Sequence, residues 1–185
     1  IELCLVGSEM CIRDRLLDLG HKVVGVDNMI GGYEDNIHKD IEFHNFDCSN
    51  FSKVKKIMKN IDVVYHCAAT AHEGLSVFSP YEITKNNYLA SVSIFSAAVN
   101  EKVKRIIFCS SMARYGEQQT PFTEDMIPKP VDPYGISKVA AEDVLKNLCD
   151  LNNIEWVIAV PHNIIGPRQI YDDPYRNVVS IFLNR

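Results

Sequence analysis

The sequence has 185 residues, of which 46% are hydrophobic, enough for one globular domain with a buried core. With a net charge of −5, the chain lacks the excess of basic residues typical of proteins that bind DNA or RNA, so no nucleic-acid partner is expected. No apolar run approaches the roughly 20 residues that span a bilayer, and no secretory leader is recognisable. We therefore expect no membrane partner and a cytoplasmic location.

Short apolar runs rich in β-branched residues alternate with helical patterns along the chain. The predicted strands are 21–27, 41–47, 61–69, 104–111 and 155–163, and the predicted helices are 52–60, 80–100 and 134–153. This alternation predicts an α/β fold, a doubly wound parallel sheet with helices on both faces. The proline-rich stretch 121–133 is expected to form a loop beside the functional site.

The six cysteines show neither CxxC spacing nor the density of a disulfide-rich domain. Several of them lie in apolar, strand-like runs. We expect buried, reduced thiols and no metal site. The cysteines are Cys4, Cys11, Cys48, Cys67, Cys109 and Cys149.

Asp27 ends the strand "KVVGVD". At the carboxyl end of a strand in a doubly wound sheet, an acid can accept hydrogen bonds from the ribose hydroxyls of an adenine dinucleotide. A carboxylate there would repel a 2′-phosphate, and the following Asn28 is not basic, so NAD is favoured over NADP. A solvated turn residue is the alternative reading of Asp27. Asp47, after the next strand, is a weaker candidate of the same kind for the adenine.

The segment "YHCAA" carries the next predicted strand into small residues. Small side chains at Cys67, Ala68 and Ala69 would let the backbone approach a ligand closely, as glycines do in a phosphate loop. His66 is more typical of a hydrogen-bonded residue at a strand end, and we give it no catalytic role.

Tyr134 and Lys138 lie four residues apart in "YGISK", and therefore on one face of a helix. A nearby ammonium stabilises phenolate and lowers a phenol pKa that is otherwise near 10, which would make Tyr134 a usable general base. Taken alone, this spacing also fits a surface pair.

Ser110 and Ser111 end the strand in "FCSSMARYG", some two dozen residues before Tyr134. A hydroxyl at this sheet edge can bind the substrate oxygen that the tyrosine deprotonates. The strand-end serine, Tyr134, Lys138 and the upstream Asp27 together form a joint signal of high specificity.

From about Leu16 to Arg185 the chain resembles the extended short-chain dehydrogenase/reductase family of NAD-dependent nucleotide-sugar epimerases and dehydratases. The motifs that carry the resemblance are "VVGVDN", "VVYHCAA", "NNYLAS", "FCSSMARYG", "PYGISK" and "PHNIIGPRQ" with "DDPYRNVV". The resemblance implies a Rossmann-type sheet, NAD as cofactor and a nucleotide-sugar (UDP-sugar) substrate. It also implies a homodimer of the full-length parent, built from the helices that begin near Pro80 and Tyr134.

The resemblance assigns roles to matching residues. Asp27 corresponds to the ribose-binding acid, Ser111 to the active-site hydroxyl, Tyr134 to the catalytic base and Lys138 to its partner, which also holds the nicotinamide ribose. Asn87 corresponds to a structural asparagine beside the cofactor. Substrate contacts are implied for Asn163, Arg176 and Asn177.

The residues after Ser111 narrow the reaction. Family members that dehydrate sugars carry an Asp-Glu pair there, and this chain has Met112 and Ala113. A UDP-sugar 4-epimerase, working through a 4-keto intermediate, is the best interpretation, and a nucleotide-sugar decarboxylase or reductase is the alternative. A non-catalytic NAD-binding module would not need Ser111, Tyr134 and Lys138 together. A flavodoxin-like signalling domain would need an acidic cluster or phosphate loop at the strand ends.

The start of the chain departs from the family. Where the family has a GxxGxxG loop for the pyrophosphate, this chain has "LVGSEMCIRD", in which Gly7 is followed by Glu9, an unfavourable neighbour for a diphosphate. Residues about 4–15 resemble the translation of a sequencing-library transposon adapter. We therefore predict that 1–15 is a non-native segment in place of the first strand and glycine loop.

The remaining boundaries follow from these observations. Residues 16–160 are predicted to form the NAD-binding domain, and 161–185 to begin a truncated substrate-binding region, because the strand-helix rhythm is lost after Pro161. Both ends of the sequence are expected to be cut. As written, the chain is expected to bind NAD weakly or not at all and to be inactive.

Overall fold

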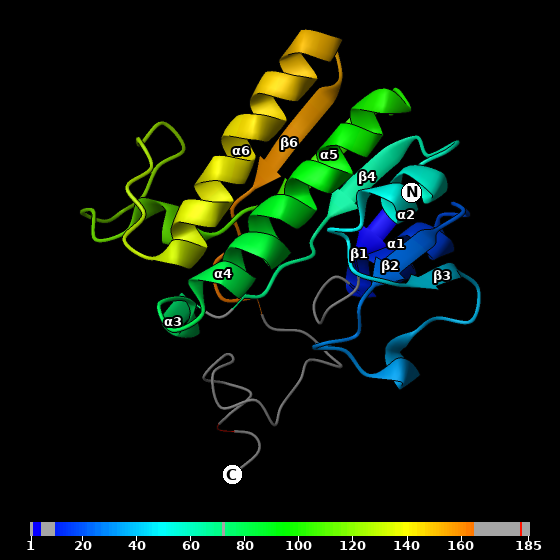
Figure 1. Ribbon diagram of the computed structural model, residues 1–185, viewed down its shortest axis with the longest axis horizontal. Helices are drawn as coiled ribbons and strands as arrows, with labels where there is room; N and C mark the ends of the chain where they lie inside the picture. Colours follow the sequence, from blue (N-terminus) through cyan, green and yellow to red (C-terminus); the bar gives the residue numbers. More distant parts are fainter. Residues whose placement is uncertain (1, 5–9, 72, 165–181, 183–185) are drawn as a thin grey trace.

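The computed structural model describes residues 2–4, 10–71, 73–164 and 182. Its centre is a six-stranded parallel sheet with strand order β3-β2-β1-β4-β5-β6 (Figure 1). The strands are β1 (Glu2–Cys4), β2 (Val24–Asp27), β3 (Glu42–Asn45), β4 (Val63–His66), β5 (Arg105–Cys109) and β6 (Glu155–Ala159). The helices are α1 (Met10–Asp18), α2 (Phe51–Ile57), α3 (Glu73–Ser76), α4 (Pro80–Ile83), α5 (Ala90–Asn100) and α6 (Pro133–Asn152). The predicted α/β fold is confirmed.

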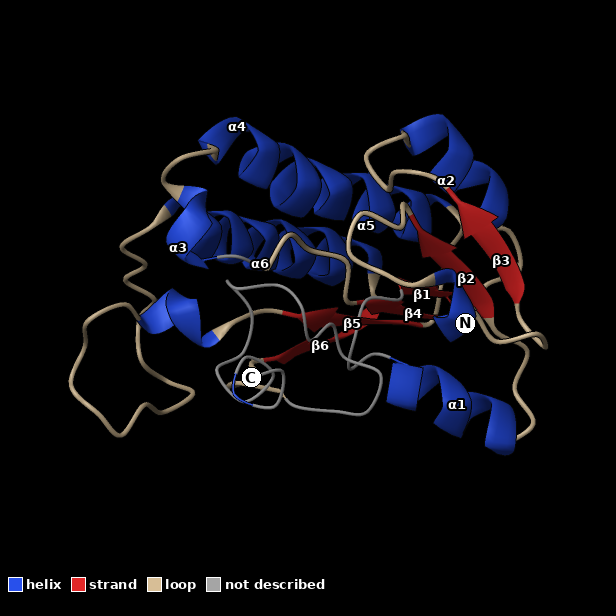
Figure 2. Cartoon of the chain, turned by 90° about the horizontal axis from the view of Figure 1, so that it is seen from below, coloured by secondary structure: helices blue, strands red, loops and turns tan. Residues whose placement is uncertain are grey.

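Helices cover both faces of the sheet, as predicted (Figure 2). On one face, α2, α5 and α6 bury the main core, in which Val26, Ile106 and Phe108 from the strands meet Phe95 of α5 and Leu145 of α6. Each of these five side chains is fully buried, so together they remove a large apolar area from water and stabilise the sheet-helix contact. The opposite face is covered by α1.

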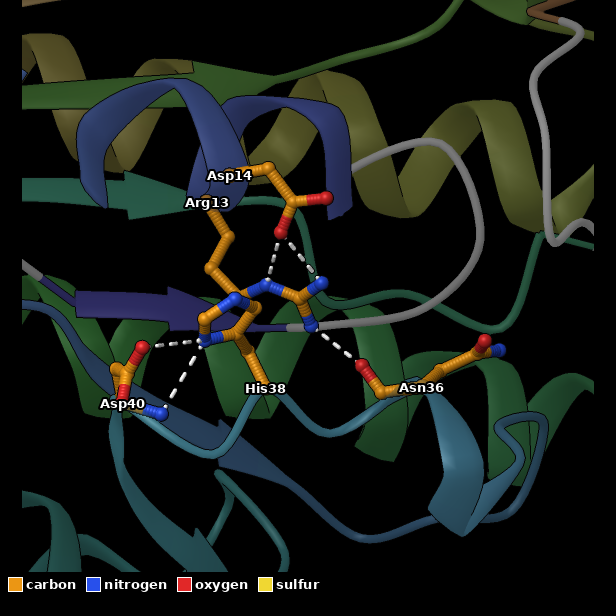
Figure 3. A network of polar contacts seen from close by, with 5 residues as sticks. All are labelled: Arg13, Asp14, Asn36, His38 and Asp40. Carbon is orange, nitrogen blue, oxygen red and sulfur yellow. Dashed lines mark hydrogen bonds and ion pairs between the residues drawn. The ribbon is translucent and has the colours of Figure 1, made fainter. Parts of the chain in front are cut away.

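Helix α1 packs on this second face of the sheet, where its Leu16 contacts Val23. Its Arg13 is buried, and the guanidinium donates to Asp14 Oδ1 from Nε at 2.8 Å and from Nη2 at 2.6 Å (Figure 3). Nη1 donates to the carbonyl of Asn36 at 2.5 Å. Arg13 therefore ties α1 to the connection between β2 and β3.

The first strand lies inside the segment that we predict to be non-native. Strand β1 is three residues long and pairs with β2 on one side and β4 on the other, at the centre of the sheet. The chain thus fills the first-strand position with Glu2–Cys4. The origin of segment 1–15, and the domain limits at 15 and 160, stay predictions.

The predicted helix 80–100 forms α4, a π-helical stretch η3 (Thr84–Leu89) and α5 in succession. Thr84 Oγ1 donates to the carbonyl of Pro80 at 2.8 Å, a back-bond that competes with the regular helical pattern. Single π turns inside α-helices are frequent at functional sites. This one contains Asn87.

Helix α6 begins and ends at residues suited to those positions. Asp132 caps its start by accepting from Gly135 N–H at 2.9 Å, and Pro133 occupies the first turn, where a missing N–H costs nothing. Asn153 ends the helix in the left-handed conformation. Within the described part of the chain, no helix is both long and apolar enough to cross a membrane.

Candidate active site

The site residues gather at the carboxyl edge of the sheet. Strands β2, β4 and β5 are parallel, so their last residues and the loops after them meet at this edge. The strand order reverses between β1 and β4, and ligands of doubly wound sheets bind at such a switch point.

Asp27 ends β2 and is buried, with 3% of its surface exposed. Its Oδ1 accepts from the backbone N–H of Met29 at 2.7 Å, whereas its Oδ2 is buried and has no hydrogen-bond partner among the described residues. Burial raises the pKa of this carboxyl from 3.8 to about 6, against the hydrogen bonds from Met29 and Asn28. A buried acceptor without a donor is expensive, and a ribose hydroxyl would supply the donor.

Asn28 and Asp47 lie near Asp27, but their side chains already have partners. Asn28 Oδ1 accepts from the backbone of Ile30 at 3.2 Å. Asp47 Oδ2 lies 3.2 Å from Lys85 Nζ of η3. Burial alone would raise the pKa of Asp47, but hydrogen bonds from Ser49 and the Lys85 ammonium outweigh it and lower that pKa. The assignment of Asp47 to the adenine stays a prediction.

The loop after β4 is held by Asn87. Its Oδ1 accepts from Thr70 N–H at 2.7 Å and its Nδ2 donates to the Thr70 carbonyl at 3.3 Å. These two bonds fix the backbone directly after Cys67, Ala68 and Ala69, the small residues predicted to approach the cofactor. The Sγ atoms of Cys67 and Cys109 lie 3.4 Å apart across the ends of β4 and β5.

His66 belongs to the core and not to the reactive edge. Its Nε2 lies 2.7 Å from Ser91 Oγ, and its ring stacks on Phe108. Burial, and to a lesser extent the Lys138 ammonium, lower the pKa of His66 to about 3. The imidazole is therefore neutral near pH 7 and serves packing.

Ser111 caps the short helix η4 (Met112–Tyr115), which follows β5. Its Oγ accepts from Ala113 N–H at 3.2 Å, which leaves its own O–H to donate. This is the property expected of a hydroxyl that orients a substrate oxygen.

Tyr134 and Lys138 lie on one face of α6 and are 7% and 3% exposed. Lys138 Nζ donates to the carbonyl of Cys109 at 2.8 Å and lies 4.9 Å from the centre of the Phe108 ring. Among the described residues no carboxylate lies within ion-pair distance of Lys138. A buried cation next to the strand end, not neutralised by an acid, suits a role beside a phenolate or a ribose.

The turn of Ser111 and the helix of Tyr134 are in direct contact. Ala113 of the turn and Tyr134 of the helix form one small buried cluster with Ile83. A Cβ at Gly135 would lie 2.8 Å from the Ala113 carbonyl oxygen and 2.9 Å from Pro130 Cβ. Glycine at this position therefore permits the close approach that joins the serine to the tyrosine and lysine.

The predicted substrate residues are less completely placed. Asn163 follows β6 with a φ of 46°, a left-handed conformation that asparagine tolerates well. Arg176 and Asn177 lie outside the described residues. In the described part of the chain, no group of three or more His, Cys, Asp or Glu side chains could hold a metal ion.

Comparison with known proteins decides the family. The sequence model of the NAD dependent epimerase/dehydratase family matches residues 5–185. The chain belongs to this family. A putative UDP-glucose 4-epimerase of Methanocaldococcus jannaschii is 33% identical over 185 residues, which cover 97% of this chain and 59% of the relative.

Solved epimerase structures share the fold. The UDP-glucose 4-epimerase of Thermotoga maritima with UDP-glucose has a TM-score of 0.91 at 28% identity, over 100% of this chain and 62% of that one. The UDP-glucose 4-epimerase of Thermus thermophilus with NAD has a TM-score of 0.90 at 29% identity, over 95% and 58%. The chain thus spans about three fifths of the length of the epimerase/dehydratase relatives that it matches.

Within this epimerase/dehydratase chain, Met112 and Ala113 form the start of η4 and bring no carboxylate to the position where sugar dehydratases carry an acid-base pair. Sequence reasoning missed two residues of the region. Gly135 is required by the close helix contact, and Glu142 is buried one turn beyond Lys138. The helical spacing places Glu142 on the buried side of α6, and this position could have identified it from the sequence.

Proposed function

We propose that the chain is the N-terminal part of an NAD-dependent UDP-sugar 4-epimerase. The observation that supports this most is the contact of the Ser111 turn with the helix of Tyr134 and Lys138. The same sheet edge carries Asp27 Oδ2, which has no hydrogen-bond partner among the described residues. The similar structure from Thermotoga maritima holds UDP-glucose, and that from Thermus thermophilus holds NAD. A cytoplasmic location stays a prediction.

The residues suit NAD at this edge. The free Oδ2 of Asp27 would accept from an adenosine ribose hydroxyl, and Lys138 would donate to the nicotinamide ribose. The cofactor, when bound, would supply the chemistry of taking a hydride from the sugar and returning it to the opposite face.

The protein's own groups would move the proton. The Ser111 hydroxyl would donate a hydrogen bond to the oxygen on C4 of the sugar and hold that oxygen in place. Tyr134 would remove the proton from the 4-hydroxyl, next to the Lys138 side chain on the same face of α6. After the 4-keto sugar rotates to present its opposite face, Tyr134 would return the proton, so one group acts as base and then as acid.

The decisive test uses the full-length protein encoded by the uninterrupted reading frame. We expect it to interconvert UDP-glucose and UDP-galactose, and we expect Tyr134→Phe to lower kcat by about a thousandfold or more while NAD stays bound. Equal turnover in the variant would overturn the mechanism. A decarboxylated or reduced product would favour the alternative enzymes, and NAD binding without turnover would favour a binding module.

A homodimer of the full-length protein is part of the proposal. Tyr81 of α4, Leu89 of η3 and Ile136 of α6 are large apolar side chains with at least half of their surface exposed. These helices pack on the same face of the sheet (Figure 1), so together they offer one apolar surface to a second copy. Sedimentation of the full-length protein should give twice the monomer mass.

A further inference from the structure

Glu142 is a buried carboxylate that the proposed mechanism does not use. It lies on α6 one turn beyond Lys138, with none of its surface exposed. Ser110 Oγ donates to its Oε1, and Arg114 Nη2 lies 3.2 Å from its Oε2. Lys146 Nζ, on the same helix, is 3.8 Å from Oε2.

The partners of Glu142 flank the active-site serine. Ser110 precedes Ser111 and follows β5, whereas Arg114 lies inside η4, which Ser111 caps. Arg114 is itself only 8% exposed, so the ion pair is shielded from water and from salt. One side chain of α6 thus contacts Ser110, directly before Ser111, and Arg114, three residues after it.

With Glu142 paired to Arg114, no described carboxylate lies within ion-pair distance of Lys138. Glutamate four residues after lysine on a helix is a common salt-bridge arrangement. Here Arg114, and not Lys138, forms the ion pair with Glu142, and Lys138 donates to the Cys109 carbonyl. The Lys138 ammonium is therefore available to interact with the Tyr134 phenol and with the nicotinamide ribose.

We propose that Glu142 is a positioning residue, which sets the distance between the Ser111 hydroxyl and the Tyr134–Lys138 pair through its contacts with Ser110 and Arg114. The inference rests on the proposed function for its catalytic consequence. Its structural part, that Glu142 holds the segment 110–116, does not depend on the reaction. Misplacement of a reacting group by about 1 Å can cost about a hundredfold in rate.

The first arm of the test is hydrogen exchange in the 185-residue chain. Glu142→Gln keeps the acceptor for Ser110 and removes the charge that faces Arg114. We expect faster amide exchange in 110–116, including Ala113 N–H, than in the unmodified chain. Asp143→Asn is the matched control, because it removes one charge from the next residue of α6, an exposed one with 73% of its side chain accessible. Unchanged exchange in Glu142→Gln, or an equal change in the control, overturns the inference.

The second arm measures turnover of the full-length protein. Glu142→Gln should lower kcat about 10- to 100-fold per NAD-loaded subunit, with KM for the UDP-sugar changed by less than about threefold. Unchanged kcat with faster exchange overturns the positioning role. If the unmodified protein shows no epimerase activity, the proposed function fails and the exchange arm alone decides the inference.

A second variant covers the case in which Glu142→Gln does not fold. Arg114→Lys keeps a cation near Glu142 but replaces the planar guanidinium, whose Nη2 lies 3.2 Å from Oε2, by an ammonium on a more flexible stem. We expect it to fold and to show both effects in the same direction, at smaller size. Wild-type exchange and kcat in this variant would contradict the proposal.

Discussion

Asp27 shows how one buried side chain combines a cost to folding with a use in binding. Its Oδ2 is buried and receives no hydrogen bond from the described residues, and burial raises the carboxyl pKa to about 6. In the proposed NAD complex this oxygen would accept from a ribose hydroxyl, whereas in the free protein its burial lowers stability. Two predictions follow from this residue.

The first prediction concerns NAD affinity. Asp27→Asn in the full-length protein should weaken NAD binding about 10- to 100-fold, because a hydrogen bond to a charged group contributes about 1.5–3 kcal/mol. The unmodified protein should bind NAD more tightly as the pH rises through about 6, since the ionised form is the better acceptor. Calorimetric titration at about pH 5 and about pH 8 would measure both effects. If Asp27→Asn binds NAD as tightly as the unmodified protein, Asp27 does not contact the cofactor.

The second prediction concerns stability without ligand. A raised carboxyl pKa means that the folded state holds its proton more tightly than the unfolded state, so stability present below about pH 4 is lost as the pH rises through about 6. Asp27→Asn should therefore be about 1–3 kcal/mol more stable than the unmodified chain at pH 7. Urea unfolding at pH 7 would measure the difference, and the gap should close near pH 4. A less stable variant at pH 7 would contradict the raised pKa.

At the scale of elements, the site depends on how closely α6 approaches η4. Gly135 lies in the first turn of α6, and a methyl group there would meet the Ala113 carbonyl and Pro130 at less than 3 Å. Both neighbours are fixed, one as backbone and one as a proline ring. The helix or the turn must therefore move if the glycine is replaced.

Gly135→Ala is expected to destabilise the chain by about 1–3 kcal/mol and to lower kcat of the full-length protein. Gly74→Ala is the control, because a Cβ built at this helical glycine meets no atom of the described residues within 4 Å, apart from its chain neighbours and its own helix backbone. The control should be neutral or slightly more stable, as expected for alanine in a helix. Thermal unfolding of the three proteins tests this, and equal midpoints for Gly135→Ala and the unmodified chain would contradict the close contact.

Several elements were predictable and others were not. Strands β2 to β6 and helices α2 and α6 lie within a few residues of the predicted spans, because their apolar periodicity is local. The π turn around Asn87 was not predicted, since it depends on a back-bond and on the packing of one long helix. The contacts of Glu142 were not predicted either, because its partner Ser110 is 32 residues away.

At the scale of the whole molecule, the start of the chain is where it departs from its family. Segment 1–15 supplies β1 and the first turns of α1, yet its sequence lacks the glycines with which the family surrounds a pyrophosphate. A helix start favours an anion, but the acidic Glu9 directly before α1 opposes one.

We predict weak or no NAD binding by the 185-residue chain. Replacing the residues before Leu16 with those encoded at the genomic locus should restore affinity to the micromolar range. Isothermal titration of both proteins with NAD would measure this. Micromolar affinity in the chain as it stands would contradict the prediction, and a locus that encodes SEMCIRD would refute the adapter origin.

The sequence alone determined the fold class and the family resemblance, and it predicted the roles of Asp27, Ser111, Tyr134 and Lys138, because periodicity and short motifs are local properties. Only the tertiary structure decided that Asp27 keeps a free buried oxygen, that Glu142 pairs with Arg114 and not with Lys138, and that Gly135 permits the contact with η4. The reason is physical: burial and partner choice depend on which distant segments the sheet brings together, and spacing along the chain does not record that.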